Sequence, residues 1–282
     1  MFKRNVNRSP AGNIFVFFML IILGAFLVLP LIYVVGAAFK TLNEIYIFPP
    51  HIIPHDPTSE NFVHLNQILS NSWVPLSRYL FNSVFVSIVS TIGHILLASM
   101  AAYPLAKHDF VGKKFVGTVV KLSLLFTASV IYIPQYIVFS QLHLINSYLA
   151  IILPALQSSL GLYLMQNFMV QIPNAMIEAA RIDGAGEAKI FFTMIMPNVK
   201  PAWLTLMIFS FQGIWNTTGG TMIYKEEIKT LPSILSQLAS GGIVRAGVTS
   251  AATLIMIVPP ILLFISSQNK VIETLSAAGM KY

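Results

Sequence analysis

The sequence predicts an all-α integral membrane protein with six transmembrane helices, and two observations support this fold class. First, 56% of the 282 residues are hydrophobic, only 10% are charged, and the mean hydropathy is +0.75. A soluble domain carries roughly 25% charged residues, so this chain has too few charges to coat a soluble surface. Second, the charged residues are bunched, and the uncharged stretches between them are as long as membrane-spanning helices.

Five uncharged stretches hold the expected helices. A helix needs about 20 apolar residues to cross a bilayer, so four stretches hold one helix each. The longest, residues 122–177, holds two, separated by the polar residues at 141–147. The first helix is too long for the apolar part of a secretory signal, so we expect it to remain uncleaved. The six expected helices cover residues of about 14–38, 80–105, 117–140, 147–169, 201–218 and 247–267.

These helices divide the chain into three expected parts. Residues 1–78 contain the N-terminal tail, the first helix and an external loop rich in proline. Residues 79–268 form a core of five helices, with a long connecting loop at 170–200. Residues 269–282 form a C-terminal tail.

The positions of the 17 Lys and Arg residues predict the orientation in the membrane. If the N-terminus is cytoplasmic, twelve of them lie on the inner side and five on the outer side. The ten acidic residues divide equally, so the whole formal charge of +7 falls on the inner side. The positive-inside rule therefore places both termini in the cytoplasm. Because membrane orientation accounts for the excess charge, we expect contact with membrane lipid and no nucleic acid.

Several enzyme classes are excluded by the residues that the chain lacks. It has no cysteine, which removes disulfides, thiolate metal sites and cysteine nucleophiles. The six histidines are scattered, with no pair at metal-ligand spacing on one helix face, so we expect no metal site. Neither a protease motif nor the nucleotide-binding GxxxxGK[ST] motif occurs. The chain is therefore not expected to be an enzyme, and it cannot hydrolyse ATP.

The loop at 170–200 contains the signals of two short helices. Pro173 suits the first turn of a helix, and Gly184 suits its C-terminal end. A second helix is expected from about Glu187 until Pro197 stops it.

The first of these short helices has the composition of a docking surface. Ile177 and Ile182 are expected near one face, and Ala179 and Ala180 are small enough to admit a close partner. We therefore predict a short helix on the cytoplasmic surface that another protein grips.

This loop resembles the EAA loop of permease subunits of binding-protein-dependent ABC importers. Met194 and Met196 stand where Ile and Leu are usual, which keeps the hydrophobic character. The matching residues are, in chain order, Glu178, Ala179, Ala180, Gly184, Met194, Met196 and Pro197.

Shorter matches resemble the sugar-importing subfamily, which is typified by the smaller permease subunit of the maltose transporter. The resemblance extends from Leu29 to the end of the chain. The matching segments are Phe39-Lys40, Phe81-Asn82-Ser83, Ala101-Ala102-Tyr103, residues 110–114, Ile133-Pro134-Gln135-Tyr136, residues 149–154, Trp215-Asn216 and Gly279-Met280-Lys281.

The resemblance implies a type I importer fold and a heteromeric complex in a bacterial or archaeal cell membrane. The implied partners are a second homologous permease subunit, two cytoplasmic ATPase subunits that bind ATP and Mg, and an external solute-binding protein that delivers a sugar. This chain itself would hold no cofactor. The residues implied to couple to the ATPase are Glu178, Ala179, Ala180, Arg181, Asp183 and Gly184. In the alternative interpretation, Glu178 is a solvated charge and Asp183 orders the turn before Gly184.

Polar and aromatic side chains at membrane depth are candidates for the translocation path, because such groups are costly unless they face a cavity or a partner. Amides and flat aromatic faces suit sugars. The candidates are Gln135, Tyr136, Gln157, Tyr163, Trp215 and Asn216. The alternative is that they form interhelical hydrogen bonds and interfacial aromatic belts.

Two other functions remain open. One is an ABC permease for a solute other than a sugar. The other is a self-contained secondary carrier or channel, although such proteins usually place ionisable residues inside helices for ion coupling. The expected helices contain no Asp, Glu, Lys or Arg in their apolar stretches, which favours the importer.

Overall fold

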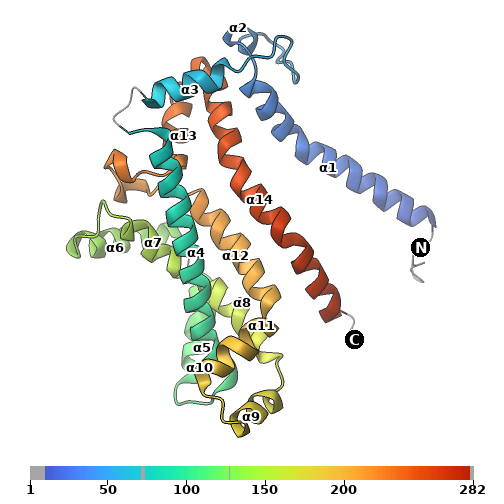
Figure 1. Cartoon of the computed structure of the whole chain (residues 1–282), viewed down its shortest axis with the longest axis vertical. Coiled ribbons are helices and arrows are strands. Elements are labelled where there is room, and N and C mark those ends of the chain that lie inside the picture. Colours follow the sequence, from blue (N-terminus) through green and yellow to red (C-terminus); the bar gives the residue numbers. More distant parts are fainter. Residues whose placement is uncertain (1–9, 71–73, 127, 280–282) are drawn as a thin grey trace. The chain divides into compact units, whose positions relative to one another are not determined.

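A computed structural model of the chain describes residues 10–70, 74–126 and 128–279. Over these residues it contains helices, turns and connecting segments but no β-strand, which confirms the all-α prediction (Figure 1). The chain folds into two compact units. The first unit lies within residues 1–71 and 235–255, and the second lies within residues 72–234 and 256–282.

The first unit is built around the junction between its two longest N-terminal helices. The Asn61 side-chain amide donates to the carbonyls of Ala38 and Lys40 at 2.9 and 2.7 Å, which caps the end of one helix from the start of another. Gly247 lies beside this amide, where a Cβ atom would overlap it. The N-terminal helices of this unit are α1 (Pro10–Ala38), α2 (Leu42–Ile45) and α3 (Glu60–Ser70).

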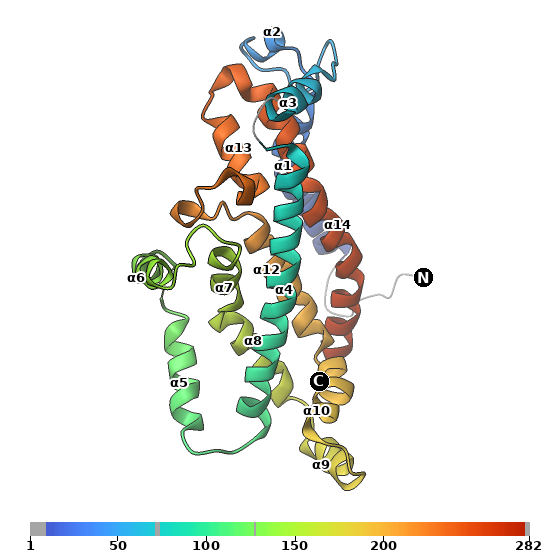
Figure 2. The same cartoon turned by 60° about the vertical axis from the view of Figure 1, so that its left-hand side comes forward.

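The second unit is centred on α4 (Leu76–Lys107). Against it pack α7 (Leu149–Leu156), α8 (Ser159–Val170) and α12 (Lys200–Trp215), as Figures 1 and 2 show. Most buried residues of α4 are small or polar, which lets neighbouring backbones approach closely. Gly161 of α8 illustrates this approach, because a Cβ atom there would overlap the imidazole of His94 on α4.

The predicted helix at 117–140 is wrong, because the structure contains two helices there. α5 (Lys113–Ser123) and α6 (Ala128–Gln141) run in clearly different directions in Figures 1 and 2. Backbone bonds from residue i to i−3 replace the α-helical pattern at residues 124–126, so the last turn tightens and the helix ends.

The predicted helix at 147–169 is also interrupted. α7 ends at Leu156, Gln157 is extended, and the Ser158 hydroxyl accepts the backbone N–H of Gly161 at 3.1 Å. Serine is a favoured N-cap residue, so α8 begins anew at this position. Apolar composition predicted the span correctly but could not reveal a cap inside it.

The remaining elements follow in chain order. Pro259 and Pro260 lie within the last helix, which continues into the range that we expected to be a tail. The elements are α9 (Asn174–Ile182), α10 (Glu187–Ile190), a π-helix at Phe191–Ile195, α11 (Met196–Asn198), 3-10 turns at Gly220–Met222, Glu226–Ile228 and Ile243–Arg245, α13 (Leu231–Ala239) and α14 (Ala246–Gly279). The terminal Met280-Lys281 match and the basic residues Lys3, Arg4 and Arg8 lie outside the described residues.

The two compact units do not follow the expected boundary at residue 78, and the division into three parts stays a prediction. Residues 235–255 group with the N-terminal part, although the prediction placed them in the core. No change in composition marks this segment, because its place depends on long-range packing such as that of Gly247 beside Asn61.

Four segments of the described residues are long and apolar enough to cross a membrane. They are Gly12–Ala38, Leu76–Lys107, Leu149–Val170 and Ile243–Gln268, the third of which combines α7 and α8. α12 has 16 residues, and α5 and α6 have 11 and 14, so none of these reaches that length alone. The count of six spans therefore stays a prediction.

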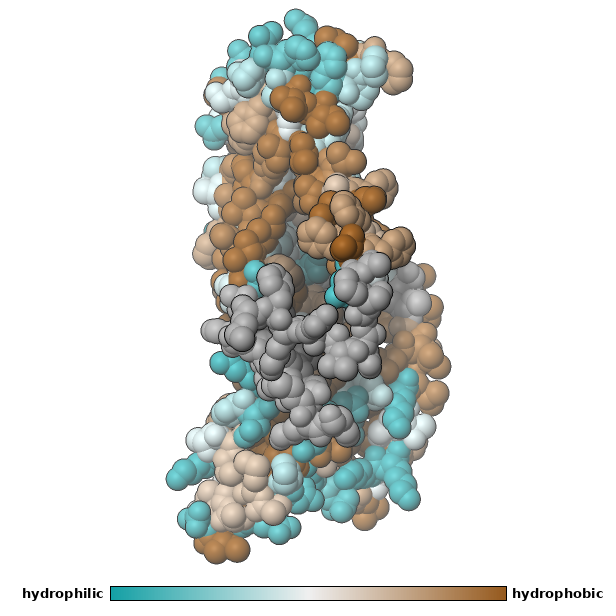
Figure 3. All heavy atoms as spheres, turned by 90° about the vertical axis from the view of Figure 1, so that its right-hand side faces the viewer, coloured by the Kyte–Doolittle hydropathy of each residue, from teal (hydrophilic) through white to brown (hydrophobic). Residues whose placement is uncertain are grey.

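The surface of the spanning helices is suited to lipid. Phe15, Ile22 and Phe26 of α1 are 70%, 69% and 70% exposed. Figure 3 shows broad apolar areas (brown) on one face of the molecule. Water would penalise such areas, whereas hydrocarbon chains would not.

Candidate functional site

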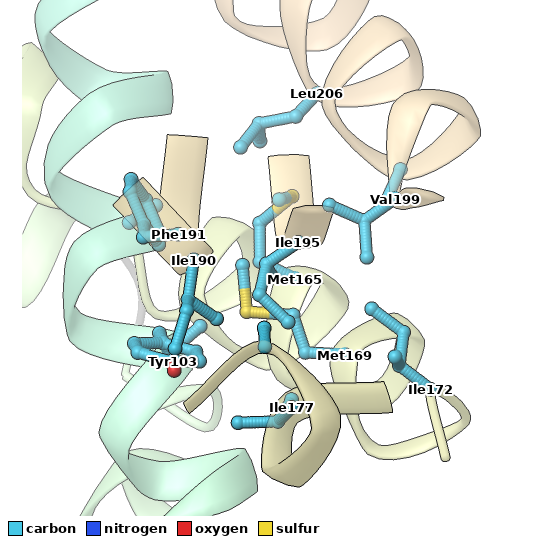
Figure 4. Packing of buried hydrophobic residues seen from close by; sticks show 14 residues of the cluster. Tyr103, Met165, Met169, Ile172, Ile177, Ile190, Phe191, Ile195, Val199 and Leu206 are labelled. Atoms are coloured by element: carbon cyan, nitrogen blue, oxygen red, sulfur yellow. The ribbon is translucent and has the colours of Figure 1, made fainter. Parts of the chain in front are cut away.

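The loop at 170–200 is attached to the second unit by buried apolar side chains. Ile177 and Ala180 of α9 are only 4% and 8% exposed and belong to an apolar cluster with residues of α4, α8 and α12. Figure 4 shows Ile177 gathered with Met165 and Met169 of α8. The two α9 residues are three positions apart, so they share one helix face. That face packs on its own chain.

The opposite face of α9 is open. Glu178, Ala179 and Arg181 are exposed, and Ile182 is 86% exposed. The prediction that Ile177 and Ile182 lie near one face is wrong, because five residues advance the helix by about 140° beyond a full turn. Ala180 was expected to admit a partner, but it is buried in its own chain. Of the two alanines, only Ala179 is available to another protein.

The C-terminal end of α9 is a Schellman motif. Gly184 has a φ of +76°, its N–H donates to the Arg181 carbonyl at 3.0 Å, and the Ala185 N–H donates to the Ala180 carbonyl at 2.9 Å. This geometry confirms Gly184 as the helix stop. Asp183 lies exposed at the preceding position, with its own N–H donating to the Ala179 carbonyl at 3.0 Å.

Glu187 joins the loop to α4 after this turn. Its carboxylate accepts the Tyr103 hydroxyl at 2.8 Å and the Arg181 Nε–H at 2.9 Å. His108 Nε2 lies 3.6 Å from the same carboxylate and 3.2 Å from Arg181 Nη2. The hydrogen bond from Tyr103 lowers the pKa of Glu187, and Arg181 lowers it further. Arg181, expected to face the ATPase, is thus engaged within its own chain.

Lys107, at the end of α4, holds the start of the loop. Its ammonium donates to the Ile172 carbonyl, to the Val170 carbonyl at 3.2 Å and to Asn174 Oδ1 at 3.1 Å. The last carbonyls of a helix lack partners within it, and a lysine there also complements the helix dipole. With Glu187 at one end and Lys107 at the other, α9 is fixed to α4 twice.

A second candidate region is a pocket of about 440 Å³ beside the breaks between α5 and α6 and between α7 and α8. It brings together Gln135 and Gln157, two of the predicted path residues. The Tyr132 hydroxyl lies 2.8 Å from Thr221 Oγ1, which fixes its ring. The pocket is lined by Ser123, Leu124, Phe126, Ile131, Tyr132, Gln135, Pro154, Gln157, Ser159 and Leu160. Amides, hydroxyls and an aromatic ring together suit hydrogen bonding and stacking with a polyhydroxyl solute.

The other predicted path residues do not line this pocket. Tyr136, Tyr163 and Asn216 are exposed elsewhere in the second unit, and Asn216 Nδ2 donates to the Gln212 carbonyl at 2.8 Å. Trp215 is 1% exposed and its Nε1–H donates to the Met256 carbonyl at 2.8 Å. Its indole is a packing group in this structure and is not available for substrate contact.

Comparison with known proteins gives the family. The sequence profile described as binding-protein-dependent transport system inner membrane component matches residues 13–273. The chain belongs to this family.

Two similar relatives of this inner membrane component match over most of both chains. The arabinooligosaccharides transport system permease protein AraQ of Halalkalibacterium halodurans is 28% identical over 90% of this chain and 91% of its own. The sulfoquinovosyl glycerol transport system permease protein SmoH of Agrobacterium fabrum is 30% identical over 89% and 88%. The fold of this chain is similar to that of one chain of a bacterial ABC transporter of known structure, which is involved in the import of the acidic polysaccharide alginate. The TM-score is 0.79 at 20% identity, over 94% of this chain and 99% of that one.

Asn82 has a structural role that the sequence analysis did not predict, because this residue stood out only as part of the Phe81-Asn82-Ser83 match. Asn82 is fully buried and its amide donates to the carbonyls of Glu227 and Lys229 at 2.8 and 2.9 Å, while its oxygen accepts the Tyr148 hydroxyl at 2.7 Å. It thereby ties the segment before α13 to the start of α4. A lone asparagine in an apolar helix, where a polar group needs partners, is the signal that points to such a role.

Proposed function

We propose that the chain is the permease subunit of an ATP-driven ABC importer and forms half of the translocation path for a sugar or oligosaccharide. The similarity to permeases named for arabinooligosaccharide, diacetylchitobiose and sulfoquinovosyl glycerol transport, over most of each chain, carries this proposal. The solute would reach the membrane on an external binding protein, and the family description as binding-protein-dependent supports this step.

The proposed topology has six spans with both termini in the cytoplasm. Beyond the four long apolar segments, α12 supplies one span and α5 with α6 supplies another. The distribution of Lys and Arg supports this orientation, which puts the loop at 170–200 on the cytoplasmic side.

The open face of α9 is the proposed contact with an ATPase subunit. Glu178 and Ala179 would lie in a cleft of that subunit, with Ile182 as an apolar contact. Because α9 is fixed to α4 through Lys107 and Glu187, a movement of the ATPase would displace α4 and α9 together as a rigid body. Gly184 keeps the exposed turn compact.

The complex proposed around this chain contains a second homologous permease subunit and two ATPase subunits. ATP and Mg would bind to the ATPase subunits, since this sequence has no phosphate-binding loop. The binding protein would contact the external segments at 40–77 and 217–245.

The proposed solute path includes the pocket that holds Gln135 and Gln157, with Tyr132 as its aromatic wall. Uncharged amides would bind hydroxyl groups without selecting for a charged solute. Permeases for other solutes share the family, so the substrate class rests on the named relatives rather than on this pocket alone.

The decisive experiment compares Glu178→Lys with Asp109→Lys, at a fully exposed carboxylate between α4 and α5, in the complex purified from the native host. We expect the ATPase and the second permease to co-purify with wild type, and binding-protein-stimulated ATP hydrolysis and sugar uptake to be lost only in Glu178→Lys. A chain that purifies alone, or a Glu178→Lys variant with full uptake, would contradict the importer and favour a self-contained carrier.

A further inference from the structure

Three side chains of the segment that follows α1 converge away from α9 and from the pocket that holds Gln135 and Gln157. One ligand atom each from Glu44, His51 and His55 lies within 4.8 Å of the other two. His55 Nδ1 is 3.5 Å and His51 Nδ1 is 4.0 Å from Glu44 Oε1. The two imidazole rings are adjacent, with centroids 4.4 Å apart.

The cluster contains buried polar atoms that lack partners. Glu44 is only 7% exposed, and although its Oε1 accepts the His55 backbone N–H at 3.0 Å, its Oε2 is buried without a hydrogen bond. His51 Nδ1 is buried and unpaired as well. Across the described residues, no lysine or arginine forms an ion pair with Glu44. A buried carboxylate oxygen without a partner is costly, so a missing ligand is the natural explanation.

We infer that Glu44, His51 and His55 bind a divalent transition-metal ion, for which Zn²⁺ is the best match. Two imidazoles and one carboxylate are a ligand set that zinc accepts, with water in the fourth position. Ca²⁺ and Mg²⁺ prefer sites made of oxygen atoms, which makes the two imidazoles unsuitable for them.

The surroundings hold the ligands in place and leave them accessible. The buried ammonium of Lys40 donates to the His51 carbonyl, which positions the backbone of this ligand. The side chains of His51 and His55 are 40% and 69% exposed, so a metal ion reaches them from solvent. The bound ion would link His51 and His55, in the segment after α2, to Glu44 within α2.

This site could not be predicted from helical spacing, because the ligands are not on one helix face. His51 and His55 lie in a segment without regular structure, and Glu44 comes from the four-residue helix α2. The expectation of no metal site was based on the spacing of histidines on one helix face, and that criterion does not detect ligands that lie outside helices.

The test is Zn²⁺ binding to the full chain in detergent micelles, measured by isothermal titration calorimetry after chelator treatment. We expect one Zn²⁺ per chain, and affinity lower by about 100-fold or more in His51→Ala, His55→Ala and Glu44→Gln, since even outer-shell changes cost 10–100-fold. His64→Ala, in an exposed histidine of α3 outside the cluster, should bind as wild type does. Equal binding by all variants, or no saturable binding, would overturn the inference.

A second measurement needs no variant, in case a substitution prevents folding. Wild-type protein is treated with diethyl pyrocarbonate, which modifies accessible imidazoles, and the modified histidines are identified by mass spectrometry. We expect Zn²⁺ to protect His51 and His55 while His64 stays reactive. Equal modification with and without Zn²⁺ would contradict the site.

Discussion

At the scale of single residues, Gly184 determines how α9 ends and therefore which residues the exposed turn presents. Its φ of +76° lies in the left-handed region, and no atom beyond the adjoining residues lies within 4 Å of the place where a Cβ would be. The only cost of a side chain there is backbone strain. We expect Gly184→Ala to lower the free energy of unfolding by about 1 kcal/mol and Gly184→Asn to cost less. Thermal unfolding in detergent measures both.

Gly186 is the matched control for this prediction. It lies two residues away in equally open space, but its φ is −70°, which any residue adopts. Gly186→Ala should leave the unfolding temperature unchanged. Equal losses at both glycines would show that the left-handed turn is not the cause.

Glu187 gives the loop a dependence on pH. Its pKa is lower in the folded chain than its ordinary value, so its tethers stabilise the fold fully above that ordinary value and lose this effect as pH falls through the folded pKa. We expect Glu187→Gln to lower the unfolding temperature at pH 7 and to have a progressively smaller effect as the pH falls below about 4.3. A pH-independent difference for Glu187→Gln would mean that the carboxylate charge is not involved.

At the scale of elements, one face of α9 packs on its own chain and the other is open, and the two adjacent alanines lie on different faces. Ala180 is 8% exposed inside the apolar cluster, whereas Ala179 is exposed. We expect Ala180→Leu to overpack the cluster and cost about 1–3 kcal/mol of stability. Ala179→Leu should leave the stability of the isolated chain intact and weaken retention of the ATPase.

Thermal unfolding of the isolated chain and co-purification of the complex measure these two effects separately. If Ala179→Leu destabilised the isolated chain, or if Ala180→Leu did not, the assignment of faces would be incorrect.

The elements also show what the sequence could and could not predict. Long uncharged stretches predicted α1 and α4 well, because the bilayer requires apolar length and little else. The breaks at residues 124–126 and 157–158 were missed, since the end or the cap of a helix changes neither hydropathy nor charge. In the loop, Gly184 was predicted as the helix end from its residue type, whereas the contacts of Lys107 with the start of the loop were found only in the structure, because its partners are distant in sequence.

At the scale of the whole molecule, the orientation in the membrane is directly testable because the chain contains no cysteine. Single cysteines at Val111, which is fully exposed between α4 and α5, and at Phe48, which is 90% exposed, provide one reporter for each side. We expect an impermeant maleimide to label Phe48→Cys in intact cells, and Val111→Cys only after the membrane is opened. Labelling of both positions in intact cells would contradict the topology.

The helices α13 and α14 each begin in one unit and end in the other, because residues 235–255 belong with the N-terminal unit. The N-terminal unit is therefore not a detachable module. Removing residues 1–71 would strip residues 235–255 of their packing partners in the middle of the remaining chain. The same arrangement means that the first unit is complete only after residues 235–255 have been synthesised, so α1, α2 and α3 lack these packing partners while the ribosome makes the intervening part of the second unit.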